Sequence, residues 1–120
     1  MRLAEDYRRD APGGGPCRVR VYEPVEAGQA PVVIITELWD NPKSPVLDEA
    51  GRFVSEITAR DVPALSGRSP VLIQHNHARE GFYLLVFSAA GTDGPGTGLG
   101  GPRWKYLDRA SVERLVGLPV

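Results

Sequence analysis

The chain has 120 residues, of which 42% are hydrophobic and 24% charged, and its formal net charge at pH 7 is −1. A chain of this length holds one domain, and its composition is too apolar for an intrinsically disordered protein. A net charge near zero also excludes a strong electrostatic attraction of the whole molecule to nucleic acid or to an anionic membrane.

The sequence contains no segment that predicts insertion into a membrane. Its apolar runs, such as the one near residues 32–35, are far shorter than the roughly 20 residues that a membrane-spanning helix needs. Residues 1–10 include no apolar stretch of signal-peptide length. The single cysteine, Cys17, cannot form a disulfide within the chain, which suits a reducing compartment. We therefore expect a cytoplasmic protein that has no membrane partner.

Residues 1–16 are expected to form a flexible arm and linker, unless the arm docks on the folded body. Leu3 and Tyr7 stand at helical spacing, which suits one or two amphipathic turns within residues 1–10. Residues 11–16 contain three glycines between two prolines, a composition that disfavours both helix and strand. The remaining residues, 17–120, are expected to form a single α+β domain.

The body begins with two predicted strands and a predicted helix. Residues 17–23 alternate between apolar and polar side chains, which indicates a half-buried strand near a sheet edge. Residues 31–38 are apolar on both faces and rich in β-branched side chains, which favours a central strand. Ser44 and Pro45 form a good helix start, and the apolar spacing after them predicts a helix that ends near residue 61.

Three further strands are predicted in the second half of the chain. Residues 70–77 and 81–88 have strand patterns and are joined by a connection of hairpin length that contains a glycine. Residues 89–101 form a glycine-rich loop that is long for a compact domain, and it is either a lid or a tolerated insertion. Residues 102–107 are expected to be a short edge strand or an extended segment.

A final helix is predicted to begin after Asp108, a good N-cap residue, and to end at Gly117. The elements then follow the order β-β-α-β-β-(β)-α. This order predicts a two-layer α+β fold in which a mixed sheet of four or five strands carries helices on one face. If the two strands that flank the first helix are neighbours in the sheet, they should be parallel and joined by a right-handed crossover.

The two histidines, His75 and His77, are two residues apart on a predicted strand, so their side chains should share one sheet face. Two imidazoles in this position can act as a base or bind one metal ion together with a further ligand. Glu37 and Asp40 are the candidate carboxylates, because parallel strands end at the same edge of a sheet. The competing interpretation is that both histidines lie on an open sheet face or at the hairpin mouth. No cofactor is identified by these residues.

Two other groups of residues are candidates for ligand binding. Trp39 and Asn41 follow the strand 31–38 at a position where ligands often bind in α/β sheets, although an ordinary turn beside a core tryptophan explains them as well. The second group mixes aromatic and basic side chains, which can stack on bases and neutralise phosphates. Its members are Arg103, Trp104, Lys105 and Tyr106, with Arg109 beside them. An edge strand with one buried face has the same pattern.

Two stretches of the chain carry a resemblance to known sequences. At Val32-Val-Ile-Ile-Thr-Glu-Leu38 with Asp40-Asn-Pro42, and at residues 102–109 with Val112-Glu-Arg-Leu115, the chain resembles small uncharacterised proteins of actinobacteria. The resemblance covers the body from Val19 onward. The resemblance implies a bacterial, cytoplasmic protein, and it implies no particular activity.

The residues favour a non-catalytic protein-interaction or regulatory module. Its partner would be another protein or a second copy of the chain, held through an acidic face within residues 21–66, an exposed sheet edge or the long loop. The first alternative is a small hydrolase-like enzyme that uses His75 and His77 with Glu37 or Asp40, with or without a metal. The second is a nucleic-acid-binding module that acts through residues 103–109.

Overall fold

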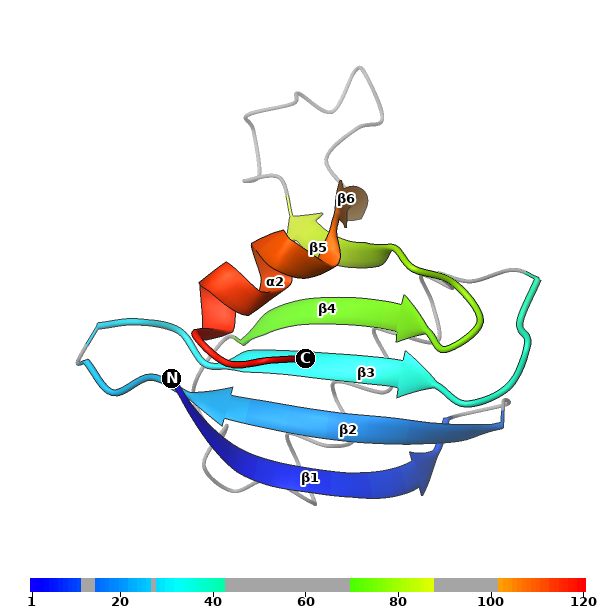
Figure 1. The fold of residues 1–120 in the computed structure, drawn as a ribbon, viewed down its shortest axis with the longest axis horizontal. Coiled ribbons are helices and arrows are strands. Elements are labelled where there is room, and N and C mark those ends of the chain that lie inside the picture. Colours follow the sequence, from blue (N-terminus) through cyan, green and yellow to red (C-terminus); the bar gives the residue numbers. More distant parts are fainter. Residues whose placement is uncertain (12–14, 27, 43–69, 88–101) are drawn as a thin grey trace.

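The computed structural model describes residues 1–11, 15–26, 28–42, 70–87 and 102–120, with the backbone alone for residues 86, 87 and 102–104. Within these residues, six strands form one sheet whose spatial order follows the order along the chain (Figure 1). The strands are β1 (Arg2–Asp10), β2 (Pro16–Glu23), β3 (Val32–Glu37), β4 (Val71–Asn76), β5 (Phe82–Phe87) and β6 (Pro102–Leu107). Neighbouring strands are antiparallel except β3 and β4, which are parallel.

The expected fold class is wrong. Within the described residues the sheet has six strands instead of four or five, and α2 (Arg109–Val116) is the single helix. Among the described residues the mixed sheet therefore dominates the fold, and the expected α+β arrangement with several helices on one face is not found. The helix predicted before residue 61 and the loop predicted at residues 89–101 lie outside the described residues.

The additional strand is β1, which occupies the segment where amphipathic turns were expected. The spacing of Leu3 and Tyr7 suggested a helix because residues four apart share a helix face. In the structure, an irregularity between Leu3 and Glu5 shifts the register, so that Leu3 pairs with Tyr22 and Tyr7 pairs with Val19. Such an irregularity puts Leu3 and Tyr7 on opposite faces of the sheet. Pairing with β2 outweighs the helical pattern because so short a helix is unstable alone.

The sheet has two buried faces, which we call the helix face, where α2 lies, and the opposite face (Figure 1). On the helix face the buried apolar side chains are those of Tyr22, Val32, Ile34, Ile73, Phe82, Val112 and Val116. On the opposite face they are those of Cys17, Val19, Val21, Val33, Ile35, Leu72 and Leu85. Successive residues of β3 enter different cores, which explains why residues 32–35 are all apolar.

The boundaries of α2 confirm the helix predicted after Asp108. The Asp108 carboxylate accepts a hydrogen bond of 2.8 Å from the backbone N–H of Ser111 and so caps the helix start. Gly117 ends the helix in the left-handed conformation, with φ of 73°, and its N–H donates to the carbonyl of Glu113. No helix in the part of the chain that the structure describes is long and apolar enough to cross a membrane.

Candidate functional site

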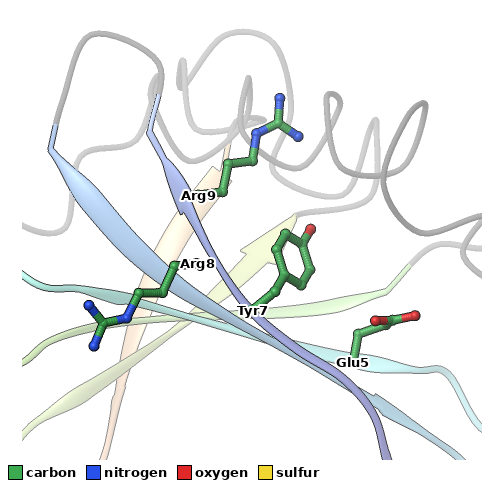
Figure 2. Close-up of a pocket in the computed structure, with 4 residues that line it drawn as sticks. All are labelled: Glu5, Tyr7, Arg8 and Arg9. Carbon is green, nitrogen blue, oxygen red and sulfur yellow. The ribbon is translucent and has the colours of Figure 1, made fainter.

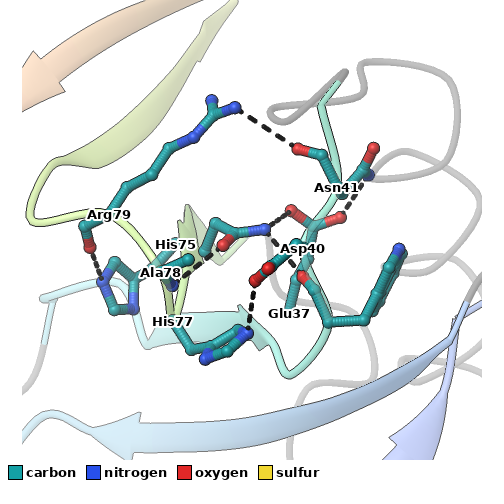
Figure 3. Close-up of polar contacts among 9 residues, drawn as sticks. Glu37, Asp40, Asn41, His75, His77, Ala78 and Arg79 are labelled. Atoms are coloured by element: carbon teal, nitrogen blue, oxygen red, sulfur yellow. Dashed lines mark hydrogen bonds and ion pairs between the residues drawn. The ribbon is translucent and has the colours of Figure 1, made fainter.

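Polar side chains gather where the parallel strands β3 and β4 end (Figure 3). The register pairs Glu37, the last residue of β3, with Asn76, the last residue of β4. Because parallel strands end at the same edge of the sheet, the residues that follow each strand also meet there. We call this group the strand-end cluster. Its members are Glu37, Asp40, Asn41, Asn76, His77 and Arg79.

Glu37 is the centre of the strand-end cluster and is only 2% exposed. Its Oε2 accepts a hydrogen bond of 2.6 Å from Nδ2 of Asn41, and its Oε1 accepts one of 3.2 Å from Nδ2 of Asn76. The Asn76 amide also donates to the carbonyl of Trp39 at 3.0 Å and accepts from the N–H of Ala78 at 2.9 Å. These groups satisfy one another, which is what a buried polar cluster requires and which suits a structural role.

His77 and Asp40 form a second pair, in which Nε2 of His77 lies 3.1 Å from Oδ1 of Asp40 (Figure 3). Their side chains are 45% and 83% exposed. A carboxylate that orients an imidazole is the arrangement of a general base. A cleft of about 290 Å³ lies at this end of the sheet, lined by Asp40, Asn41, Pro42, Asn76, Ala78 and Arg79. Of the expected catalytic residues, this pair alone combines mutual contact with exposure to solvent.

His75 is buried on the helix face and makes contacts with different partners. Its Nε2 lies 2.9 Å from the backbone carbonyl of Arg79, which can only accept, so Nε2 carries the hydrogen. Its Nδ1 lies 3.4 Å from the hydroxyl of Thr36. The Arg20 guanidinium donates a hydrogen bond of 3.2 Å to that hydroxyl. The imidazole stacks on the ring of Phe82 with centroids 4.1 Å apart. Both ring nitrogens are therefore occupied within the protein.

His75 and His77 do not lie on the same strand, and they contact different partners. β4 ends at Asn76, and His77 already belongs to the turn that follows. The alternation of side chains along a strand therefore stops before His77. No group of three metal-ligating side chains occurs among the residues that the structure describes.

The pH dependence of stability should report the buried His75. Burial lowers the pKa of His75 below its ordinary value of 6.5, against a smaller opposite effect of the hydrogen bond to the Arg79 carbonyl. The unfolded chain therefore binds this proton more readily than the folded one. The contribution of the neutral His75 to the free energy of unfolding is fully present above about pH 7 and declines as the pH falls toward about 5. Urea midpoints measured across this range check the decline. His75→Gln should flatten it, whereas His77→Gln should retain it; an unchanged slope in His75→Gln would contradict the assignment.

Trp39 and Asn41, expected to bind a ligand, have structural roles in this arrangement. Trp39 packs against the core of the opposite face, and its ring lies 3.0 Å from the position that a Cβ atom at Gly15 would occupy. Gly15 thus leaves the space that the indole ring fills. Asn41 is buried and donates to Glu37, as described above.

The aromatic and basic residues of the C-terminal segment lie on β6, at one edge of the sheet. Lys105 and Tyr106 are exposed, and the ring of Tyr106 packs edge-on against the ring of Tyr83 with centroids 5.8 Å apart. The side chains of Arg103 and Trp104 lie outside the described residues.

The outer side of β1 is a feature that sequence reasoning missed. β1 stands at the end of the sheet, so one side of its backbone pairs with β2 and the other has no partner strand among the described residues. Glu5, Tyr7, Arg8 and Arg9 line a pocket on this strand (Figure 2). Charged side chains dominate the strand, and its irregularity breaks the period. No apolar alternation was therefore present to reveal it.

Ion pairs attach β1 to β2. The Arg18 guanidinium holds the Asp6 carboxylate through two hydrogen bonds of 2.8 and 2.7 Å, and Arg2 pairs with Glu23. The hydrogen bonds from Arg18 lower the pKa of Asp6 below its ordinary value of 3.8. Asp6 therefore stays ionised at neutral pH.

Comparisons with protein-family models, with curated proteins and with solved structures found no match for this chain.

Proposed function

We propose that the chain is a protein-interaction module that adds an extended strand of its partner to the outer side of β1. A strand bound to a sheet edge gains affinity from main-chain hydrogen bonds and specificity from the side chains beside them. The observation that carries the proposal is the direction of the backbone groups of β1. The single cysteine and the resemblance noted above support a place in the bacterial cytoplasm.

The backbone groups of β1 alternate between the two sides of the strand, as in any antiparallel ladder. Just after β1, the N–H of Ala11 donates a hydrogen bond of 3.0 Å to the carbonyl of Gly15, which leads into β2. Because the direction repeats at every second residue, the N–H and C=O of Tyr7, four residues before Ala11, also face β2. Those of Asp6 and Arg8 therefore point outward, where a partner strand would bind.

The hydrogen bonds between β2 and β3 lead to the same assignment of inward and outward backbone groups on β1. Asp10 pairs with Pro16, and the carbonyl of Pro16 accepts a hydrogen bond of 2.9 Å from the N–H of Leu38, which follows β3. Pro16 thus directs its backbone toward β3, and as a proline it has no N–H to donate to β1. The pair between Asp10 and Pro16 is consequently one without mutual hydrogen bonds, which turns the backbone groups of Asp10 outward as well.

The two edges of the sheet differ in how open they are to pairing. β6 has six residues, begins with a proline and carries two basic residues, Arg103 and Lys105, without an acidic one. Proline and like charges are the features by which natural sheets protect their edges. β1 has nine residues, contains no proline and carries charges of both signs. We therefore assign the partner strand to β1.

Arg8→Pro should abolish strand addition while the fold is retained. The N–H of Arg8 faces outward, so proline removes a donor to the partner without breaking a bond to β2, the position at which edge strands tolerate proline. Arg8→Ala is the matched control, because it removes the same charge and keeps the N–H. The probe is a library of random linear peptides displayed on phage, selected on the wild-type chain.

Selected peptides are expected to bind Arg8→Ala nearly as well as the wild type and to bind Arg8→Pro at least about tenfold more weakly, which is about 1.4 kcal/mol. Urea midpoints of both variants confirm that they are folded. The proposal fails if no peptide is enriched, or if enriched peptides bind both variants equally.

A further inference from the structure

We propose that the partner strand is β1 of a second copy of the chain, antiparallel to the first, with Tyr7 of both copies on the two-fold axis. This inference rests on the proposed function, because it names the partner for the same strand edge. Three features of the sheet support it: the direction of the backbone groups along β1, the order of charges on β1 and the difference between the two edges.

The backbone allows few registers for such a pair. Outward and inward groups alternate, so each outward residue must face an outward residue of the other copy, and the axis must pass through a residue. With the axis at Tyr7, Asp6 faces the partner's Arg8 and Glu5 faces the partner's Arg9. Symmetry repeats both pairs. Every charged side chain from residue 5 to residue 9 then lies opposite a charge of the other sign.

The neighbouring registers set like charges against each other. An axis at Asp6 brings that carboxylate opposite the partner's Asp6. An axis at Arg8 brings two guanidinium groups together and sets Asp6 opposite the partner's Asp10. Like charges directly opposite across a strand pair are destabilising, and a register is well specified when its neighbours are penalised. The order of charges therefore selects the register centred on the uncharged Tyr7.

The proposed contacts lie on both faces of the joined sheet. The register with β2 places Asp6 and Arg8 on the helix face and Glu5, Tyr7 and Arg9 on the opposite face. The Tyr7 pair is of the narrow kind without mutual hydrogen bonds, with Cα atoms about 4.5 Å apart, and each Tyr7 side chain keeps its packing against the core of the opposite face. Exposed ion pairs contribute only about 0.2–1 kcal/mol each. We therefore expect a reversible dimer that weakens as salt is added.

The pairing is self-limiting. Each copy uses the same strand, so the contact is isologous and closes after two copies. On the opposite edge, self-pairing of β6 centred on Trp104 would set Arg103 against the partner's Lys105, which is unfavourable. A heterologous contact between β1 and β6 would instead build a chain of growing length, which gives the experiment a clear alternative.

A charge exchange between two variants tests the register. Glu5→Lys places lysine opposite the partner's Arg9, and Arg9→Glu places glutamate opposite the partner's Glu5, so each variant alone should dimerise at least about tenfold more weakly than the wild type. In an equimolar mixture, the lysine of one variant faces the glutamate of the other, and dimerisation should return to nearly the wild-type affinity. Glu26→Lys, an equal charge change in an exposed loop, is the control and should leave dimerisation unchanged.

Sedimentation equilibrium over a range of protein and salt concentrations provides the measurement, and urea midpoints confirm that each variant is folded. The inference is overturned by a wild-type chain that stays monomeric, by species that grow beyond the dimer, or by a mixture of variants that does not regain affinity. If the wild type is monomeric while selected peptides still require the N–H of Arg8, the proposed function stands and this inference alone fails. If neither peptides nor a second copy require that N–H, both fail.

Discussion

Asn76→Asp is expected to lower the free energy of unfolding by about 3–5 kcal/mol, because it buries a second carboxylate against the first. Asn76 is 3% exposed, and its Nδ2 donates to the Glu37 carboxylate at 3.2 Å and to the Trp39 carbonyl at 3.0 Å. The substitution replaces this donor with an oxygen that faces two acceptors. The amide of Asn41 on the other oxygen of Glu37 cannot compensate for both losses.

Urea unfolding at neutral pH measures this effect. Gln29→Glu, the same change of amide to acid at an exposed position, should shift the free energy of unfolding by less than about 0.5 kcal/mol. The deficit of Asn76→Asp should also shrink under acidic conditions, because protonation of the introduced carboxyl restores a hydrogen-bond donor. A loss below about 1 kcal/mol at neutral pH would show that Asn76 does not hold Glu37 in the way the contacts imply.

Phe82→Ala is expected to cost about 3–5 kcal/mol of folding stability, the range for removing a large buried aromatic ring. Phe82 has no exposed surface, its ring stacks on His75 with an interplanar angle of 11°, and the Arg109 guanidinium lies 5.4 Å from its centroid. The ring therefore connects the buried imidazole of β4 with the first residue of α2. Its removal should also let water reach His75 and raise the pKa of that side chain toward its ordinary value.

Urea midpoints and an NMR titration of the imidazole test both parts of this prediction. Phe82→Leu preserves most of the apolar volume and should cost less than about 1.5 kcal/mol. Leu115→Ala removes an apolar side chain that is 41% exposed and should cost less than about 1 kcal/mol. If the pKa of His75 does not rise in Phe82→Ala, burial by Phe82 is not what lowers it.

Much of the sheet could be predicted from local patterns in the sequence. The alternation of residues 17–23 and the apolar run of residues 31–38 correspond to β2 and β3, and the strands expected at residues 70–77 and 81–88 correspond to β4 and β5. These predictions succeeded because a strand buried on one face has alternating apolar side chains, and a strand buried on both faces has a continuous apolar run. β1 has neither pattern, because most of its side chains are charged and its place in the sheet depends on pairing with β2.

The candidate site was predictable only in part. The ends of β3 and β4 could be expected to meet, and His77 does lie beside Asp40. The contacts of His75 with Thr36 and Phe82 could not be expected, because they depend on which strands are neighbours and in which register. The same holds for Glu37, whose amide donors come from residues 41 and 76.

The sequence by itself determined the local elements of this protein: the apolar strands, and the final helix with its caps at Asp108 and Gly117. These features depend on residues within a few positions of each other, so their physical causes are present in any short window. The tertiary structure decided that residues 2–10 are a strand, that the two histidines contact different partners and that the outer side of β1 has no partner strand among the described residues. Each of these outcomes depends on hydrogen bonds and packing between residues far apart in the chain. A short stretch of sequence does not show which distant residues will pair.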